Sequence, residues 1–110
     1  MKHELFTGIA KRLLAADHVV IYGQAKQAHH VFSHVIKRLS EETPTITIRR
    51  GMGNNKIELE NGATLRTLHS ENALRGLMAD LFIALKPLST GTELTLQAHG
   101  TKIIPVAFDH

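Results

Sequence analysis

Apolar residues in the first forty positions recur with the spacing of helices, and a short apolar run separates two helical stretches. An apolar residue at every third or fourth position of residues 2–16 predicts an amphipathic helix, and residues 24–39 repeat the pattern. Between them, residues 18–22 (His-Val-Val-Ile-Tyr) form a β-branched run typical of a strand buried on both faces of a parallel sheet. A strand followed by Gly23 and a helix is the opening of a βαβ unit.

The period of the apolar pattern changes to two after Pro44, which predicts strands. The strands expected from this alternation are 45–49, 56–60 and 63–68. Asn61-Gly62 lies between the last two and is a strong hairpin signal, whereas residues 50–55 form a glycine- and asparagine-rich turn. Residues 70–78 are expected to form a short helix or loop, with Ser70 a candidate N-cap.

The last third of the chain contains one apolar run and two alternating segments. Residues 81–85 predict a second buried strand, which Lys86-Pro87 ends. Residues 92–98 and 102–108 predict two more strands, joined by a turn at His99-Gly100. Because Pro105 has no N–H group, the last strand is expected at a sheet edge.

Together these elements predict an α/β fold with a mixed sheet, built as one small domain over residues 1–110. The parallel strands are 18–22 and 81–85, and antiparallel hairpins lie beside them. The last strand is apolar on both faces, which also predicts self-association through a sheet edge; its apolar residues are Ile103, Ile104, Val106 and Phe108.

Composition narrows the function classes. The chain has no cysteine, which excludes disulfides, a thiolate nucleophile and a Cys-based zinc site. Its net charge is +3 and its pI is about 9.5, a mild excess that permits nucleic-acid binding without requiring it. No segment has the length of a membrane span or the pattern of a secretory signal, so we expect a cytoplasmic protein, in the host cell if it is viral.

Three segments, in order, resemble the ATPase core of phage terminase large subunits, a RecA-like fold. They are VVIYGQAKQAHHVFSHVI, KIELENGATLRTL and SENALRGLMADLFIAL. The second resembles the I-x-L-x-N-G-S-x-I segment of that family, and the third resembles its LRG…AD approach to the Walker B strand. The resemblance covers about two-thirds of the chain, residues 19–85, and implies a RecA-like fragment from a phage protein.

The sequence departs from this family where ATP is bound and hydrolysed. A Walker A loop is glycine-rich, ends in Lys-Ser/Thr and leads into a helix. The segment Gly51-Met52-Gly53-Asn54-Asn55-Lys56 lacks the Ser/Thr and leads into a predicted strand. Lys86-Pro87 also follows the strand 81–85 at the place where the resemblance implies the Walker B acids. We therefore expect no catalytic residues, no cofactor and no ATP hydrolysis.

Four basic residues cluster around the predicted hairpin: Arg49, Arg50, Lys56 and Arg66. A basic ribbon beside a glycine-containing loop could contact phosphates without reading sequence. The alternative is ordinary solubilising charge, offset by Glu58 and Glu60. The residues alone leave these two interpretations open.

Three further motifs have structural as well as functional interpretations. His30 and His34 lie four residues apart on one helix and could share a metal, but two ligands with no cysteine nearby favour a solvated helix face. Tyr22-Gly23-Gln24 follows a parallel strand, where α/β sheets bind ligands, or it is a tight turn. Arg75-Gly76 is explained by a helix C-terminus.

The sequence thus predicts a non-catalytic phage protein derived from a terminase-like core. It would act as a nucleic-acid-binding or packaging-associated module, with DNA as a partner through phosphate contacts. The alternative is a protein-interaction module that self-associates through sheet edges or binds another phage protein, without binding nucleic acid. Neither interpretation involves a membrane or a metal.

Overall fold

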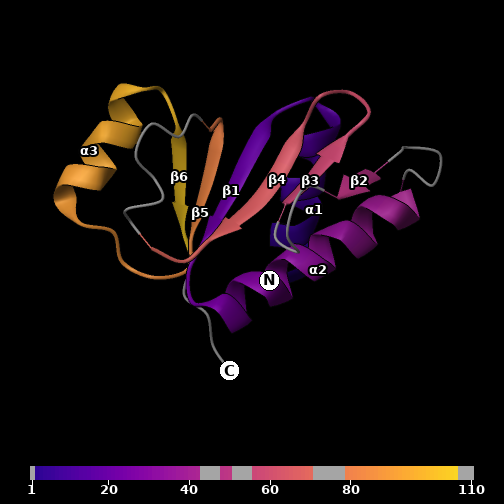
Figure 1. Cartoon of the computed structure of the whole chain (residues 1–110), viewed down its shortest axis with the longest axis horizontal. Coiled ribbons are helices and arrows are strands. Elements are labelled where there is room, and N and C mark those ends of the chain that lie inside the picture. The colour runs from indigo at the N-terminus through magenta and orange to yellow at the C-terminus, as the bar shows by residue number, and fades with distance from the viewer. Residues whose placement is uncertain (1, 43–47, 51–55, 71–78, 107–110) are drawn as a thin grey trace.

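The computed structural model describes residues 2–42, 48–50, 56–70 and 79–106, and Figure 1 shows their arrangement. Within these ranges the helices are α1 (Lys2–Leu14), α2 (Ala25–Glu42) and α3 (Thr90–Ala98). The strands are β1 (His18–Tyr22), β2 (Ile48–Arg50), β3 (Lys56–Leu59), β4 (Thr64–Leu68), β5 (Leu81–Ala84) and β6 (Lys102–Pro105). The predicted helices 2–16 and 24–39 and the buried strands 18–22 and 81–85 are confirmed.

The strands form one mixed sheet in the order β2-β3-β4-β1-β5-β6. β1 lies between β4 and β5 and runs parallel to both, and β6 runs parallel to β5. β2 and β3 are antiparallel to their neighbours. The predicted α/β class with a mixed sheet is therefore correct, and the central strands are the parallel ones.

The hairpin between β3 and β4 is built by Asn61 and Gly62, as the sequence predicts. Gly62 adopts a φ of 92°, a left-handed conformation that suits glycine. The Asn61 side chain accepts a hydrogen bond from the Ala63 amide at 3.0 Å and donates one to the Leu13 carbonyl at 3.0 Å. The second bond attaches the hairpin to the end of α1, so that one asparagine positions both elements.

Helices cover both faces of the sheet, and each face has its own apolar cluster (Figure 1). α1 and α2 pack on one face, which we call the α1–α2 face. Its buried residues include Ile9, Leu13, Phe32, Val35, Leu39, Val19, Ile21, Ile57, Leu65 and Ile83. α3 lies on the opposite face, the α3 face, with the buried residues Val20, Tyr22, Leu68, Phe82, Ala84 and Leu96. α3 is the only helix on that face among the residues that the structure describes.

The predicted strand 92–98 is wrong, because this segment is helix α3. The Ser89 side chain accepts a hydrogen bond from the Thr92 amide and caps the helix N-terminus. Gly100, with a φ of 81°, ends the helix in a left-handed conformation. The segment is therefore a crossover between two parallel strands, and the predicted C-terminal hairpin does not form.

Several predicted features fall outside the described residues. They are most of the strand 45–49, the turn at 51–55, the segment 71–78 with Arg75-Gly76, and the end of the strand 102–108. Among the strands that the structure describes, β6 is the last of the sheet, as predicted from Pro105. Among the described ranges, no helix combines the length and apolar character needed to cross a membrane.

Candidate functional site

The carboxyl ends of β4, β1 and β5 meet at one edge of the sheet, which is where open α/β sheets bind ligands. The Gly23 amide donates to the Leu68 carbonyl at 3.1 Å, and the Leu85 amide donates to the Tyr22 carbonyl at 2.8 Å. His69 lies 3.1 Å from the Gly23 carbonyl through its Nδ1 atom. The backbone ladder thus continues past each strand end and holds the three connections together.

Gly23 allows the turn from β1 into α2 to approach β5 closely. A Cβ atom at this position would lie 2.7 Å from the Leu85 Cβ, which is closer than such atoms come in proteins. A side chain would therefore push the two strand ends apart. Close packing explains the Tyr22-Gly23-Gln24 segment as a tight strand-to-helix turn.

Lys86 places a positive charge where β5 ends. Its Nζ atom donates a hydrogen bond to the His69 carbonyl at 2.8 Å and lies 4.9 Å from the centre of the Tyr22 ring. An ammonium over an aromatic face is attracted by the ring quadrupole. The lysine is thus half-buried and held on two sides, and it repels a divalent cation at this strand end.

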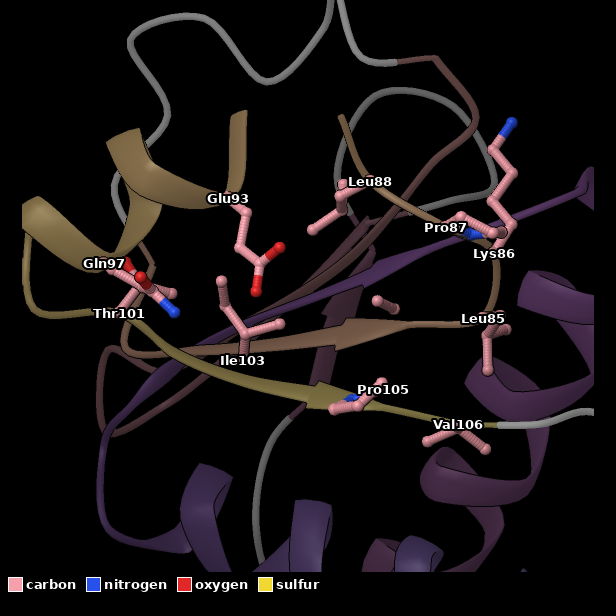
Figure 2. A pocket seen from close by; sticks show the side chains of 11 residues that line it. Leu85, Lys86, Pro87, Leu88, Glu93, Gln97, Thr101, Ile103, Pro105 and Val106 are labelled. Atoms are coloured by element: carbon pink, nitrogen blue, oxygen red, sulfur yellow. The ribbon is translucent and has the colours of Figure 1, made fainter. Parts of the chain in front are cut away.

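A hollow of about 680 Å³ opens beside this edge, between α3, the connection after β5 and strand β6. Its apolar lining includes Leu85, Leu88, Ile103, Pro105 and Val106. Figure 2 shows the Glu93 carboxylate projecting from α3 into the hollow above Ile103, whereas Lys86 extends away from it. Glu93 forms no salt bridge within the described part of the chain. The carboxylate that faces the hollow therefore has no salt-bridge partner among the described residues, and Gln97 and Thr101 add polar groups to the lining.

The four predicted basic residues lie at the other end of the sheet, on β2, β3 and β4. Lys56 and Arg66 are direct register partners on the α3 face, and both are half-buried. In the β2–β3 register, Arg49 lies opposite Glu58 and Arg50 lies opposite Ile57. The structure thus brings Lys56 and Arg66 together, while Arg49 is opposite a glutamate.

Neither Lys56 nor Arg66 is neutralised within the described residues. The ion pairs there are Arg12 with Asp17 at 2.6 Å and Arg38 with Glu41 at 3.9 Å. The Arg66 Nε atom is shielded from solvent and has no hydrogen-bond partner in the same part of the chain. The pair is consequently a local concentration of positive charge.

The two histidines considered as metal ligands pack against helix α1. The His34 ring stacks on Phe6 with 4.9 Å between centroids, and His30 meets His34 edge-on at 4.4 Å. Both residues are exposed, in agreement with a solvated helix face. Within the described ranges, no three His, Cys, Asp or Glu side chains are grouped to hold a metal.

Sequence reasoning missed the hollow and Glu93, because it placed residues 92–98 in a strand. The signal that could have found them is Ser89 followed three and four residues later by Thr92 and Glu93, which suits a helix N-terminus. The Lys86-Pro87 pair was identified from sequence. The contacts of Lys86 with His69 and Tyr22 depend on how β5, β1 and β4 align, which the sequence pattern does not determine.

No protein-family model matches the chain, and no curated protein matches it. Solved structures do match. The ATPase domain of the large terminase of Thermus phage P74-26 has a TM-score of 0.69 at 17% identity and covers 94% of this chain. A single-residue mutant of that domain has a TM-score of 0.68 at 16% identity, again over 94% of this chain.

The described chain thus has the fold of part of a phage terminase ATPase domain, as the sequence resemblance implies. It spans only about half of that domain, 53% of the matched chain. At this level of identity the likeness concerns the fold alone.

Proposed function

We propose that this chain is a non-hydrolysing phage module with the terminase ATPase fold, and that it binds nucleic acid through phosphate contacts in a packaging-associated role. The observation that carries the proposal is the direct pairing of Lys56 with Arg66 across β3 and β4. Like charges directly opposite each other in a sheet are destabilising. An anionic partner between them would relieve that repulsion.

A neighbouring glutamate and the lack of a described base-reading helix determine how a nucleic acid could be bound here. Glu58 is opposite Arg49 and next but one to Lys56 on the same strand, so it lowers the local potential. No described helix presents a row of base-reading side chains beside this pair. We therefore propose phosphate contacts that position a nucleic acid without reading its sequence.

Lys86 supports the non-hydrolysing part of the proposal. Its ammonium lies at the carboxyl end of β5 and is bound to the His69 carbonyl, where a magnesium-binding acid would be needed for phosphoryl transfer. Purified protein is expected to show no magnesium-dependent ATP turnover above a no-protein blank. Turnover that is lost in a Lys86→Ala variant would overturn this part.

The test of nucleic-acid binding compares two double variants in a salt titration. Lys56→Ala with Arg66→Ala should weaken binding to a duplex equally for unrelated sequences. It should also reduce the slope of log affinity against log salt by about two units, since each lost phosphate contact removes roughly one. Fluorescence anisotropy of labelled duplex and single-stranded DNA measures both quantities.

A matched control removes two exposed lysines from helix α2 on the other side of the sheet. Lys26→Ala with Lys37→Ala lowers the net charge by the same amount, and it should leave most of the slope intact. Equal losses in both double variants would mean that only net charge matters. Such a result, or equally weak binding by wild type and all variants, would contradict the proposed site.

A second candidate function is protein interaction through a sheet edge. It is favoured by the position of β6, which pairs with β5 on one side and with no other described strand. This interaction would need none of the basic residues on β3 and β4.

A further inference from the structure

The outer edge of β6 presents a specific set of backbone groups. The Lys102 and Val106 amides donate to the Asp80 and Ala84 carbonyls, both at the β5 side. Because backbone groups alternate along a strand, residues 102, 104 and 106 face β5, whereas Ile103 and Pro105 face outward. Proline has no N–H, so the outward groups are the N–H and C=O of Ile103 and the C=O of Pro105.

This edge is poor in donors, which limits pairing with a second copy of itself. Within residues 102–106, each copy brings one outward N–H, that of Ile103, so two β6 strands could form at most two ladder bonds over this segment. The Thr101 amide cannot add to them, because it donates to the Leu96 carbonyl at 3.1 Å. A strand with ordinary amides could use the same edge fully, accepting from Ile103 and donating to both carbonyls.

Apolar hollows lie on both faces of the sheet next to this edge. On the α3 face is the 680 Å³ hollow that Ile103 and Pro105 line. On the α1–α2 face is a hollow of 260 Å³, lined by Leu5 and Ile9 of α1 and by Ile104. The side chains of an added strand alternate between the two faces and would enter both hollows.

The charges in the hollows differ, and this difference selects the partner. Glu93 and Lys86 both line the α3-face hollow, and Figure 2 shows the Glu93 carboxylate directed inward and the Lys86 ammonium directed away. Arg12, Lys102 and Glu4 also line the smaller hollow, and Arg12 is already paired with Asp17 at 2.6 Å. A basic side chain therefore suits the α3 face, and apolar side chains suit the other.

We propose that the outer edge of β6 binds an extended strand from a different polypeptide, with a basic side chain against Glu93 and apolar side chains on the α1 side. The strand continues the sheet by β-augmentation, in which main-chain bonds give affinity and pockets give specificity. This inference rests on the second candidate function and is independent of nucleic-acid binding.

The test uses a synthetic peptide of about nine residues that alternates valine and threonine and has one central lysine. Amide hydrogen exchange should show the Ile103 N–H unprotected in the free protein and protected with peptide, while Ile104 is protected in both. Two further peptides are N-methylated at alternate residues, one along the edge that would face β6 and one along the opposite edge. The first should bind about tenfold more weakly than the unmethylated peptide. A central glutamate in place of lysine should also weaken binding, and Glu93→Gln should remove that preference.

Ile103→Pro provides the matched protein variant. It removes the one outward donor of residues 102–106 and leaves the β5 ladder intact, so the Ile104 amide should stay protected while peptide affinity falls. Ile103→Val should bind as wild type does. DNA binding by Ile103→Pro should be unchanged, which separates this site from the basic pair.

Three outcomes would overturn the proposal. The first is equal binding of the free-amide and both N-methylated peptides, and the second is no protection of Ile103 at saturating peptide. The third is concentration-dependent dimerisation, by light scattering, that itself protects Ile103. That result would make a second copy the occupant.

Discussion

The two faces of the sheet differ in what their residues do. On the α1–α2 face a layer of buried apolar side chains joins two helices to the four strands β1, β3, β4 and β5, and the partly buried Ile104 of β6 packs against it. On the α3 face the buried cluster is small, and the same face carries Lys56, Arg66, Glu93 and the larger hollow. Among the described residues, the α1–α2 face therefore carries most of the buried core, and the α3 face carries the side chains on which the two proposals rest.

Helix length accounts for much of this difference. α1 and α2 have 13 and 18 residues, long enough to lie across the sheet, whereas α3 has 9. α3 buries Leu96 and leaves Leu94 60% exposed. A helix held by one buried leucine contributes less apolar burial to folding than a helix with a full stripe.

The largest expected effect tests this division directly. Phe32→Ala on the α1–α2 face should lower the free energy of unfolding by about 3–5 kcal/mol, because it opens a cavity in the main core. Leu96→Ala on the α3 face should cost about 2 kcal/mol, at the low end for a buried leucine, because its surroundings can collapse toward the hollow. Urea denaturation followed by circular dichroism measures both.

Equal losses of unfolding free energy in these two variants would contradict the view that the α1–α2 face carries most of the core. Leu94→Ala serves as the control on α3, and because Leu94 is largely exposed it should change stability by less than about 0.5 kcal/mol. A large effect at Leu94 would mean that α3 is covered by a surface other than the sheet.

The α1–α2 face was predictable from sequence because its signals are redundant. The helical stripes, the β-branched run before Gly23 and the Asn61-Gly62 turn all favour the same arrangement, and each is confirmed. The α3 face was less predictable. Thr92, Leu94 and Leu96 alternate with the period of a strand. The Ser89 cap and the Gly100 terminus favour a helix, and the segment follows these local signals and not the alternation.

The candidate sites show the same contrast. Lys56 and Arg66 were found from sequence, and their direct pairing follows from the hairpin register that Asn61-Gly62 sets. The hollow beside β6 could not be found, because it requires the crossover by α3 to place Glu93 above Ile103. Contacts between elements distant in sequence depend on topology, which local pattern does not determine.

The next prediction concerns Gly23, at the turn from β1 into α2. Gly23→Ala should lower stability by about 1–3 kcal/mol, because the new Cβ overpacks against Leu85. Gly8→Ala is the matched control, since no atom lies within 4 Å of its Cβ position and α1 gains a better helix former. It should raise stability by roughly 0.5–1 kcal/mol. Thermal unfolding of both variants checks the opposite signs, and a neutral Gly23→Ala would remove the close-packing account of this turn.

The smallest expected change in stability tests whether repulsion between Lys56 and Arg66 on the α3 face destabilises the free protein. Lys56→Glu replaces a like-charge pair with an opposite-charge pair against Arg66, so it should raise stability by about 0.2–1 kcal/mol while weakening DNA binding. Lys56→Gln removes the repulsion without adding attraction, and its stability should lie between wild type and Lys56→Glu.

A double-mutant cycle with Arg66→Gln isolates the pair from Glu58, which lies on the same strand and opposes the gain. The stabilisation by Lys56→Glu should largely disappear when Arg66 is absent. If Lys56→Glu instead lowers stability in both backgrounds, the lysine is held by packing and not by a tolerated repulsion. The observation that carries the nucleic-acid proposal would then be lost, whatever the strand-binding edge at β6 does.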